Sequence, residues 1–363
     1  MNTLDNAPWP DYPKSKLITG VKLDKYRYHK GDGDMWPITW ADDDSLYGAA
    51  GDNHGSPMNF WRIVTDEVHP WDTQLWLVNN MPVDPGEYCR VPGSDRCNSV
   101  KPAGLLCMDA TFHLAVECMN YGDNPAFNRQ HNLNGWIITS SDHGVTWDCD
   151  ATRTDFFTGR LASCHFVQFG RDYAGARDSY VYAYFPGVGD DGQSYWENGD
   201  YIILGRVPRD ELLDRGAWEF FVGHEGDSEA RWHSDDAEAA SVFRYPLMTG
   251  EDHVSYNAGI GRYILGNYSF LDQKGSPRPL HQKPYPQAAE RSQLTLFEAP
   301  EPWGPWSLFY RDDNWGTYGG YQPVFPTKLM SGEGTKMVMV SSGTFDDYNF
   351  TSQHMALQIA VQG

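Results

Sequence analysis

MWPITWADDDSLYGAAG, residues 35–51, consists of two short apolar runs on either side of an aspartate-rich turn. Short runs rich in Val, Ile, Tyr, Phe and Trp, bounded by Gly, Asp, Asn or Pro, are typical of strands, and they dominate the chain. The best helical candidate, residues 208–215, is long enough for a single short turn. The sequence therefore predicts an all-β protein.

The pattern of two apolar runs around a turn occurs five times. The pairs are MWPITW with SLYGAAG, AGLLCM with TFHLAVEC, FVQFG with SYVYAYF, SVFRYP with VSYNAGIGRYILG, and PVFPTKL with KMVMVSSG. The second runs begin near residues 45, 111, 179, 254 and 336, so five units account for nearly all of the 363 residues. Such repeats indicate a single five-bladed β-propeller domain over residues 1–363. Its blades are expected at about residues 20–85, 98–155, 160–225, 238–312 and 318–363.

Two local signals favour the same fold. The octet SSDHGVTW, residues 140–147, fits the S-x-D-x-G-x-T-W "Asp box" of outer propeller hairpins, so Asp142 is expected to have a structural role. Proline cannot donate to a strand ladder and is confined to edges, and the innermost strand of a blade is such an edge. Four units have a proline in or beside their first run: Pro37, Pro102, Pro246 and Pro323.

The charge balance restricts the ligand class. The chain carries 49 acidic and 28 basic residues, a formal net charge of −21, which repels phosphate backbones and anionic membranes. We therefore expect a neutral ligand and no nucleic-acid partner. The sequence contains no run of 18 apolar residues, so it predicts no membrane-spanning helix. We also expect a monomer. The first residues, MNTLDNAPWPDYP, lack the charged and apolar regions of a signal peptide, although a chain with its signal removed would look the same.

The six cysteines have neither CxxC spacing nor Cys/His metal spacing. Cys89 and Cys97 flank a polar loop, where a disulfide and two thiols are both open alternatives. Cys107 and Cys118 lie in apolar runs and are predicted to be buried free thiols. No cofactor is expected to be required, and a structural cation in the central channel is compatible with the sequence.

The hairpin of residues 34–52 suggests a pair of catalytic carboxylates. If Trp40 faces Leu46, the same register places Asp34 opposite Asp52 at the channel mouth, with Cα atoms about 4.5–5.5 Å apart. Two carboxylates this close push one pKa upward and leave one acid and one base, which glycoside hydrolysis requires. The alternative is that both are turn residues whose carboxylates accept hydrogen bonds from backbone amides.

The aspartates between the two strands, residues 42–44, belong to the turn at the opposite end and are expected to be solvated or to bind turn amides.

The loops at the end of Asp34 and Asp52 are rich in aromatic and planar polar residues, which suit a neutral carbohydrate. They are residues 120–132, 187–199, 267–287 and 310–322. At this end we expect eight substrate-binding residues: Trp36, Asn53, His54, His165, Trp196, Trp315, Tyr318 and Gln322. Asn53 and His54 would orient the acid, and His165 would orient a ligand, hold a water or bind a channel metal. A purely structural role is open for His165 and for the aromatic residues.

The segments DGDMWPITWADDDSLYGAAGD, HGS, APEPWGPWSLFY, GGYQPVFPTKLM and MVMVSSGTF resemble the endo-D-arabinanase family. These are five-bladed propeller enzymes of glycoside hydrolase family 183, formerly a domain of unknown function. The likeness extends from about residue 20 to the C-terminus and is most specific in residues 31–55 and 300–343. It implies cleavage of D-arabinofuranosyl linkages by two aspartates of the first blade, which correspond to Asp34 and Asp52.

The sequence thus predicts a secreted glycoside hydrolase that cuts arabinofuranosyl linkages. The resemblance implies endo action on the D-arabinan of mycobacterial or actinobacterial arabinogalactan or lipoarabinomannan. The alternative is a non-catalytic carbohydrate-binding propeller, or a propeller of a virion or cell surface. L-arabinanase and xylosidase propellers place a glutamic acid on another blade, and no Glu of this sequence is as persuasive as Asp34 and Asp52. Which aspartate is the acid, and the stereochemical outcome, stay open.

Overall fold

The computed structural model describes residues 12–29, 31–53, 56–65, 73–81, 99–120, 131–188, 194–196, 199–225, 229–271, 275, 291–316, 320–343 and 348–361. Its regular structure is almost entirely β, with six 3₁₀ turns of three residues each: η1 (Gly159–Leu161), η2 (Arg171–Tyr173), η3 (Arg209–Glu211), η4 (Arg215–Ala217), η5 (Asp236–Glu238) and η6 (Thr327–Leu329). Within these residues no helix has the length and apolar character needed to cross a membrane.

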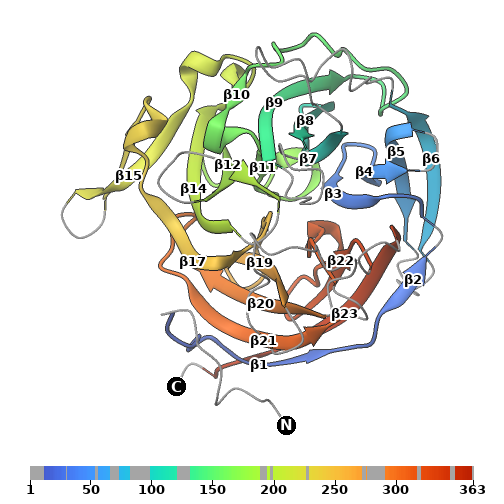
Figure 1. Ribbon diagram of the computed structural model, residues 1–363. Coiled ribbons are helices and arrows are strands. Elements are labelled where there is room, and N and C mark those ends of the chain that lie inside the picture. The colour runs from blue at the N-terminus through green and yellow to red at the C-terminus, as the bar shows by residue number, and fades with distance from the viewer. Residues whose placement is uncertain are drawn as a thin grey trace.

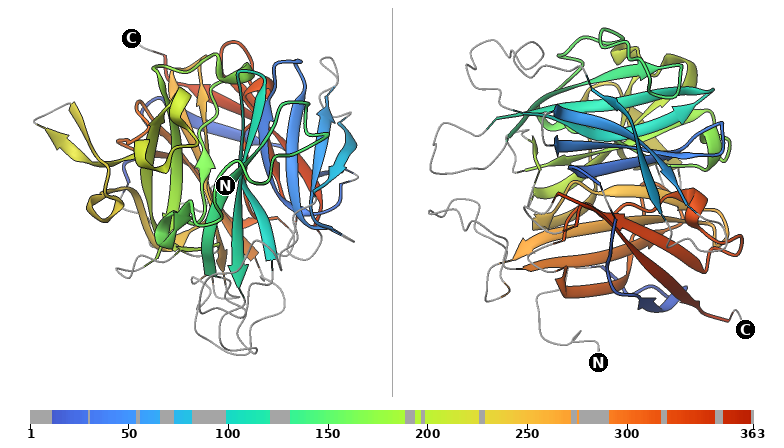
Figure 2. Two further views of the ribbon diagram at one scale, coloured as in Figure 1. Left: turned by 90° about the horizontal axis from the view of Figure 1, so that it is seen from above. Right: turned by 90° about the vertical axis from the view of Figure 1, so that its right-hand side faces the viewer.

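The strands form five antiparallel sheets around a common centre, which confirms the predicted five-bladed β-propeller (Figure 1). The first sheet contains β3 (Asp34–Trp40), β4 (Leu46–Asn53), β5 (Ser56–Val64) and β6 (Gln74–Asn80). The second contains β7 (Ser99–Met108), β8 (Thr111–Asn120), β9 (His131–Ser140), β10 (Phe157–Thr158) and β13 (Ser194–Tyr195). Seen from the side in Figure 2, most strands run through the thickness of the disc.

The third sheet contains β11 (His165–Phe166), β12 (Tyr180–Gly187), β14 (Gly199–Pro208), β15 (Glu219–Glu225), β16 (Glu229–His233) and β17 (Ser241–Thr249). The fourth contains β18 (His253–Asn257), β19 (Arg262–Leu271), β20 (Arg291–Ala299) and β21 (Ser307–Trp315). The fifth contains β22 (Lys336–Ser341), β23 (Phe350–Ile359), β1 (Ile18–Leu23) and β2 (Arg27–His29). The hairpin that includes β15 projects from the rim of the disc (Figures 1 and 2).

The fifth blade is completed by the N-terminal part of the chain. β1 and β2 both pair with β23, so the two ends of the described chain share one sheet and close the ring. The sequence placed residues from about 20 onward in the first blade, whereas the first sheet begins at Asp34. The pairing covers the outer edge of β23, which would otherwise present unpaired backbone groups.

The fourth sequence unit is divided differently from the prediction. Residues 241–246 lie in β17, which pairs with β14 of the third sheet, and β18 and β19 form the hairpin that opens the fourth sheet. Pro246 is therefore not in an innermost strand, whereas Pro37 and Pro102 are. An apolar run marks a strand, but it does not determine the partner of that strand.

The Asp box has the predicted structural role. Ser140 Oγ accepts from the Gly144 amide (2.9 Å), and Asp142 accepts from the amide and the hydroxyl of Thr146 (2.9 and 2.6 Å). The Trp147 ring packs edge-on against Phe60 of the first blade, with centroids 5.0 Å apart. The box thus fixes its own turn and joins the second blade to the first.

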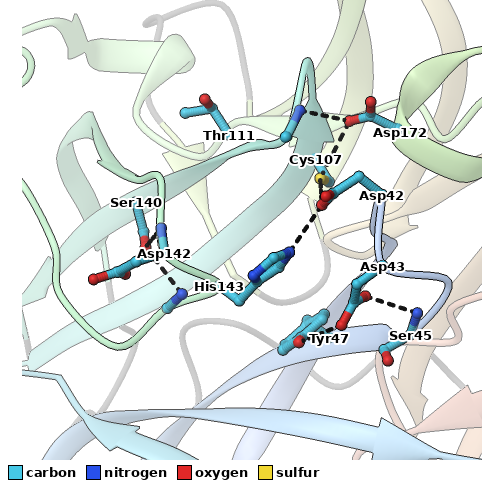
Figure 3. Close-up of polar contacts among 12 residues, drawn as sticks. Asp42, Asp43, Ser45, Tyr47, Cys107, Thr111, Ser140, Asp142, His143 and Asp172 are labelled. Carbon is cyan, nitrogen blue, oxygen red and sulfur yellow. Dashed lines mark hydrogen bonds and ion pairs between the residues drawn. The ribbon is translucent and has the colours of Figure 1, made fainter.

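Residues 42–44 also behave as predicted, as the turn between β3 and β4 at the end away from Asp34. Figure 3 shows the contacts of Asp42 and Asp43. Asp43 accepts from the Ser45 amide (2.8 Å) and the Tyr47 hydroxyl (2.9 Å), and Asp42 lies 3.0 Å from His143 Nε2 of the second blade. These contacts hold the turn and tie it to its neighbour.

The two cysteines that were predicted to be free thiols differ in the structure. Cys107 is a buried free thiol, as expected, and burial is the main reason that its pKa is raised. Cys118 is disulfide-bonded, so that prediction was wrong. An apolar strand accommodates a thiol and a disulfide sulfur equally well, so the apolar run around Cys118 could not distinguish a free thiol from a disulfide. The partner of Cys118 lies outside the described residues, as do Cys89 and Cys97.

Candidate active site

The register of the first hairpin changes halfway along. Trp40 pairs with Leu46 and Ile38 with Gly48, as predicted, but the register shifts between Ile38 and Met35. Asp34 consequently pairs with Gly51 rather than with Asp52. The shift is a bulge, a feature that disrupts the ladder locally and bends the strand. The prediction of two directly opposed aspartates was therefore wrong by one residue.

Left-handed backbone conformations accumulate around this bulge. The φ angles of Met35, Trp36, Asp52 and Gln322 are 77°, 53°, 50° and 51°. L-residues adopt this region rarely, and it persists where the surrounding structure imposes it. Residues in strained conformations cluster at functional sites, so these residues favour a site between the first and fifth blades.

Lys101 brings the two aspartates together. It lies on β7, the innermost strand of the second blade, and its Nζ is 2.6 Å from Asp52 Oδ2 and 3.3 Å from Asp34 Oδ1. The two distances together set an upper limit of about 5.9 Å on the separation of the two oxygens. The predicted convergence of Asp34 and Asp52 is thus present, although it arises through a cation of the neighbouring blade.

The two carboxyl groups have different surroundings. The Asp52 side chain is 35% exposed and the Asp34 side chain 8%. Burial raises the pKa of Asp34 to about 6, because the favourable charge of Lys101 offsets only part of the desolvation and Asp52 adds repulsion. Tyr321 donates its hydroxyl to Asp34 Oδ2 (3.2 Å). Burial lowers the pKa of Lys101, but the two aspartates outweigh it, and the net shift is upward.

A second carboxyl pair, Glu117 and Glu251, is completely buried. Glu251 Oε1 accepts from Asn132 Nδ2 (3.0 Å) and Ser163 Oγ (3.3 Å), and its Oε2 accepts from Gln322 Nε2 (2.9 Å). Glu117 has no exposed surface and lies beside Glu251 and Ser163 without a hydrogen bond of normal geometry.

Burial raises the pKa of Glu251 to about 7 and that of Glu117 well above its ordinary value, with repulsion from Glu251 adding to the shift of Glu117. Glu251 accepts hydrogen bonds from three side chains, so we assign the proton of this pair to Glu117. The sequence had offered no Glu comparable to the aspartates, and the structure reveals these two.

Two histidines lie near this pair and are neutral at neutral pH. His165, the first residue of β11, is fully buried; its Nε2 is 2.7 Å from Ser163 Oγ, and its ring is 4.8 Å from that of His253. Burial lowers the pKa of His165 well below its usual range and that of His253 to about 4. Neither ring therefore supplies positive charge to the carboxyl groups.

Some of the residues predicted to bind substrate lie near these groups. Gln322 donates to Glu251, and Trp196 packs against Tyr321 with ring centroids 6.2 Å apart. Asn53 follows Asp52 at the end of β4 and donates to the Ala50 carbonyl (2.9 Å).

Other predicted residues lie elsewhere. Trp36 is completely buried and packs edge-on against Phe350 of the fifth blade, and Trp315 is 1% exposed and donates to Gln353. The structure places both in the packing between blades, and the Trp36 indole also donates to the carbonyl of Gly33, which directly precedes Asp34. His54 and Tyr318 lie outside the described residues.

Sequence reasoning missed Lys101, Glu117, Glu251 and Tyr321. A weak signal existed for two of them. Lys101 precedes a proline that was assigned to an innermost strand, and Glu117 is the single acidic residue in the apolar run TFHLAVEC. A charged residue in an otherwise apolar strand is rarely buried unless it is paired, so it indicates a partner across the fold.

In the described residues no group of three or more His, Cys, Asp or Glu side chains is arranged to hold a metal ion. A channel cation therefore stays a prediction.

No family model and no curated protein matches the sequence. Among solved structures, the chain is similar to a Bacteroides ovatus protein provisionally described as a hydrolase, at 12% identity over 89% of this chain and 85% of that one, with a TM-score of 0.52. It is also similar to an exo-1,5-α-L-arabinanase from a bovine ruminal metagenomic library (10% identity, 93% and 96% coverage, TM-score 0.49). A third is an arabinanase from Bacillus subtilis (9% identity, 91% and 96% coverage, TM-score 0.48). The Bacteroides ovatus similarity shows a shared fold.

Proposed function

We propose that the protein is a glycoside hydrolase that cleaves arabinofuranosyl linkages with Asp34 and Asp52 as its reacting carboxyl groups. The observation that carries the proposal is their convergence on Lys101 at one end of the channel. One of the two groups, Asp34, is buried with a pKa raised to about 6, so it can hold a proton at a pH where an ordinary carboxyl group has lost it. Glycoside hydrolysis requires such an acid beside a second carboxyl group.

The short separation of the two groups favours a retaining reaction. Carboxyl groups of retaining glycosidases lie about 5–5.5 Å apart, whereas inverting enzymes leave room for water at about 6.5–9.5 Å. The bridged oxygens of Asp34 and Asp52 lie within about 5.9 Å of each other. In the first step one carboxylate attacks C1 while the other group gives its proton to the leaving oxygen. In the second step the deprotonated group takes a proton from water, the water oxygen attacks C1, and the bond to the protein breaks.

The substrate class follows from charge and from the resemblance to endo-D-arabinanases. A net charge of −21 disfavours anionic polymers, and arabinan is neutral. Residues 31–55, where the resemblance is most specific, contain both aspartates. We therefore favour endo cleavage of D-arabinan from an actinobacterial cell wall, by a protein that acts outside the cell.

The proposal is tested by incubating the protein with D-arabinan and with L-arabinan and following the products by NMR. We expect oligosaccharides from D-arabinan whose new reducing ends first appear with the anomeric configuration of the cleaved bond. Asp34→Asn and Asp52→Asn should each lower the rate by about 10²- to 10⁴-fold while the fold is kept. Asp150→Asn, at an exposed position, is the matched control and should keep full activity.

Near-normal turnover by either aspartate variant would refute the assignment. Binding of arabinan oligosaccharides without product release would instead establish the non-catalytic carbohydrate-binding propeller.

A further inference from the structure

We propose that Lys101 is a positioning residue that binds the Asp52 carboxylate and leaves Asp34 as the carboxyl group that carries the transferable proton. The inference rests on the proposed function for the consequence in catalysis, but the electrostatic arrangement can be tested without it. It assigns distinct roles to two aspartates that the sequence treats alike.

The contacts of the ammonium are unequal. Lys101 Nζ is 2.6 Å from Asp52 Oδ2, a short charge-assisted contact, and 3.3 Å from Asp34 Oδ1. The Tyr321 hydroxyl, the other group that contacts Asp34, is also at a long distance, 3.2 Å. The ammonium therefore interacts more strongly with Asp52 than with Asp34. The two longer contacts of Asp34 can also be made by a neutral carboxyl group.

The Lys101 stem is confined, so the ammonium stays at this place. The side chain is 3% exposed. Gly51, the partner of Asp34 in the hairpin, leaves the space that the stem occupies, because a Cβ there would lie 2.8 Å from Lys101 Cδ. A residue with a side chain at position 51 would displace the stem. The glycine thus couples the hairpin that carries both aspartates to the lysine of the next blade.

The acidic groups around Lys101 outnumber its single positive charge. Those that face Lys101 or its neighbours are Asp34 and Asp52 from the first blade, Glu117 directly across the β7–β8 ladder, Glu251, and the Tyr321 phenol. One ammonium neutralises one carboxylate, and the neutral His165 and His253 add no charge. Of the two aspartates, the buried one loses more hydration on ionising and retains the proton.

The roles in the reaction follow. Asp52 Oδ attacks C1 as the bond to the leaving sugar breaks, and the Asp34 proton passes to the leaving oxygen. Asp34 then takes a proton from water as that water attacks C1 and releases the Asp52 carboxylate. Lys101 donates no proton in either step. Its charge would maintain the difference between the two groups through the cycle.

The electrostatic part is tested with Lys101→Met and the charge-preserving Lys101→Arg, in full-length protein labelled with ¹³C at its aspartate carboxyl groups. The Asp34 signal is identified by its loss in Asp34→Asn. We expect its titration to move to higher pH by about 1–2 units in Lys101→Met and to stay near its original position in Lys101→Arg. An unchanged titration in folded Lys101→Met would overturn the proposal. If Lys101→Met does not fold, Lys101→Gln serves the same comparison.

The catalytic part has its own readouts. In Lys101→Met the bell-shaped profile of kcat/KM should move to higher pH, because both carboxyl groups lose a nearby cation, and its maximum should fall about 10²-fold. A lower maximum with no shift would mean a structural role only. If the wild-type protein hydrolyses no glycan, the proposed function fails while the titration still decides the role of Lys101.

The assignment of roles is tested with activated substrates. Asp34→Asn should release a rapid burst of dinitrophenol from a dinitrophenyl arabinofuranoside, whose leaving group needs no acid, followed by slow turnover because the second step lacks its base, and it should lose activity on arabinan. Asp52→Ala should be inactive on both and regain turnover with azide, releasing a glycosyl azide. The reverse pattern would exchange the two roles and contradict the proposal.

Discussion

At the scale of single residues, the protein contains carboxyl groups whose burial disfavours their charged forms. The pKa of Glu117 is raised well above its ordinary value, that of Glu251 to about 7 and that of Asp34 to about 6. A raised pKa means that the folded state binds the proton more tightly than the unfolded chain. Stability from these groups is therefore fully present below about pH 4 and is lost as the pH rises through the folded-state pKa values.

We predict that Glu117→Gln stabilises the protein above pH 5 and flattens the pH dependence of its free energy of unfolding. The amide replaces a carboxyl group that can ionise in the unfolded chain but not at its buried position, and its NH₂ can donate to Glu251. The gain at pH 7 is expected to be about 1–3 kcal/mol. Denaturant unfolding at pH 5 and pH 7 measures it, and the exposed Asp150→Asn variant should show no such change. A loss of stability at pH 7 would contradict the prediction.

At the scale of elements, β3 shows how a local irregularity positions a site. Its half next to the turn, Ile38 to Trp40, keeps the register that alternation predicts, and the bulge between Met35 and Ile38 moves Asp34 opposite Gly51. Gly33, directly before the strand, has a φ of 108°. A Cβ at this position would collide with Asn53 Oδ1 and the Gly51 carbonyl oxygen. The glycine thus allows the two ends of the hairpin to approach each other.

We predict that Gly33→Ala destabilises the protein by about 1–3 kcal/mol and lowers activity, because both the φ angle and the contact oppose a side chain. Gly332→Ala is the matched control, since its φ is outside the left-handed region and a Cβ there meets no atom within 4 Å. Thermal unfolding and arabinan turnover measure both variants. Equal stability of the two variants would show that the hairpin end tolerates a side chain.

At the scale of the whole molecule, ring closure joins the two ends of the described chain. Five residue pairs link β1 to β23 and three link β2 to β23, while β22 covers the inner side of β23. The fifth blade therefore depends on segments that are more than 300 residues apart. Tyr321 and Gln322 belong to this blade and contact the site, so their position depends on the same pairing.

We predict that a chain beginning at residue 30 loses at least about 4 kcal/mol of stability, since each lost backbone hydrogen bond contributes about 0.5–1.5 kcal/mol. Thermal unfolding should become broader as well as earlier, because β23 is left with an uncovered edge. Adding a peptide of residues 12–29 should restore part of the midpoint. An unchanged midpoint in the truncated chain would show that the fifth blade holds without β1 and β2.

The sequence by itself determined what depends on neighbouring residues. Alternation and turn residues identified the strands, their repetition identified five blades, and the Ser, Asp, Gly and Trp of residues 140–147 identified the box. These features form within one hairpin, where periodicity and turn chemistry suffice. The pairing of β17 with the third sheet and of β1 and β2 with the fifth was missed, because an apolar run does not identify its partner.

The tertiary structure alone decided the chemistry of the site. Lys101 is 67 positions from Asp34, and its charge reaches both aspartates because two innermost strands meet at the channel. Glu117 and Glu251 come from the second blade and the start of the fourth, and their burial side by side raises both pKa values. Desolvation and charge proximity depend on which groups share a space rather than on which share a segment. The sequence therefore indicated the two aspartates, while the tertiary structure brought Lys101 to both of them and buried Glu117 beside Glu251.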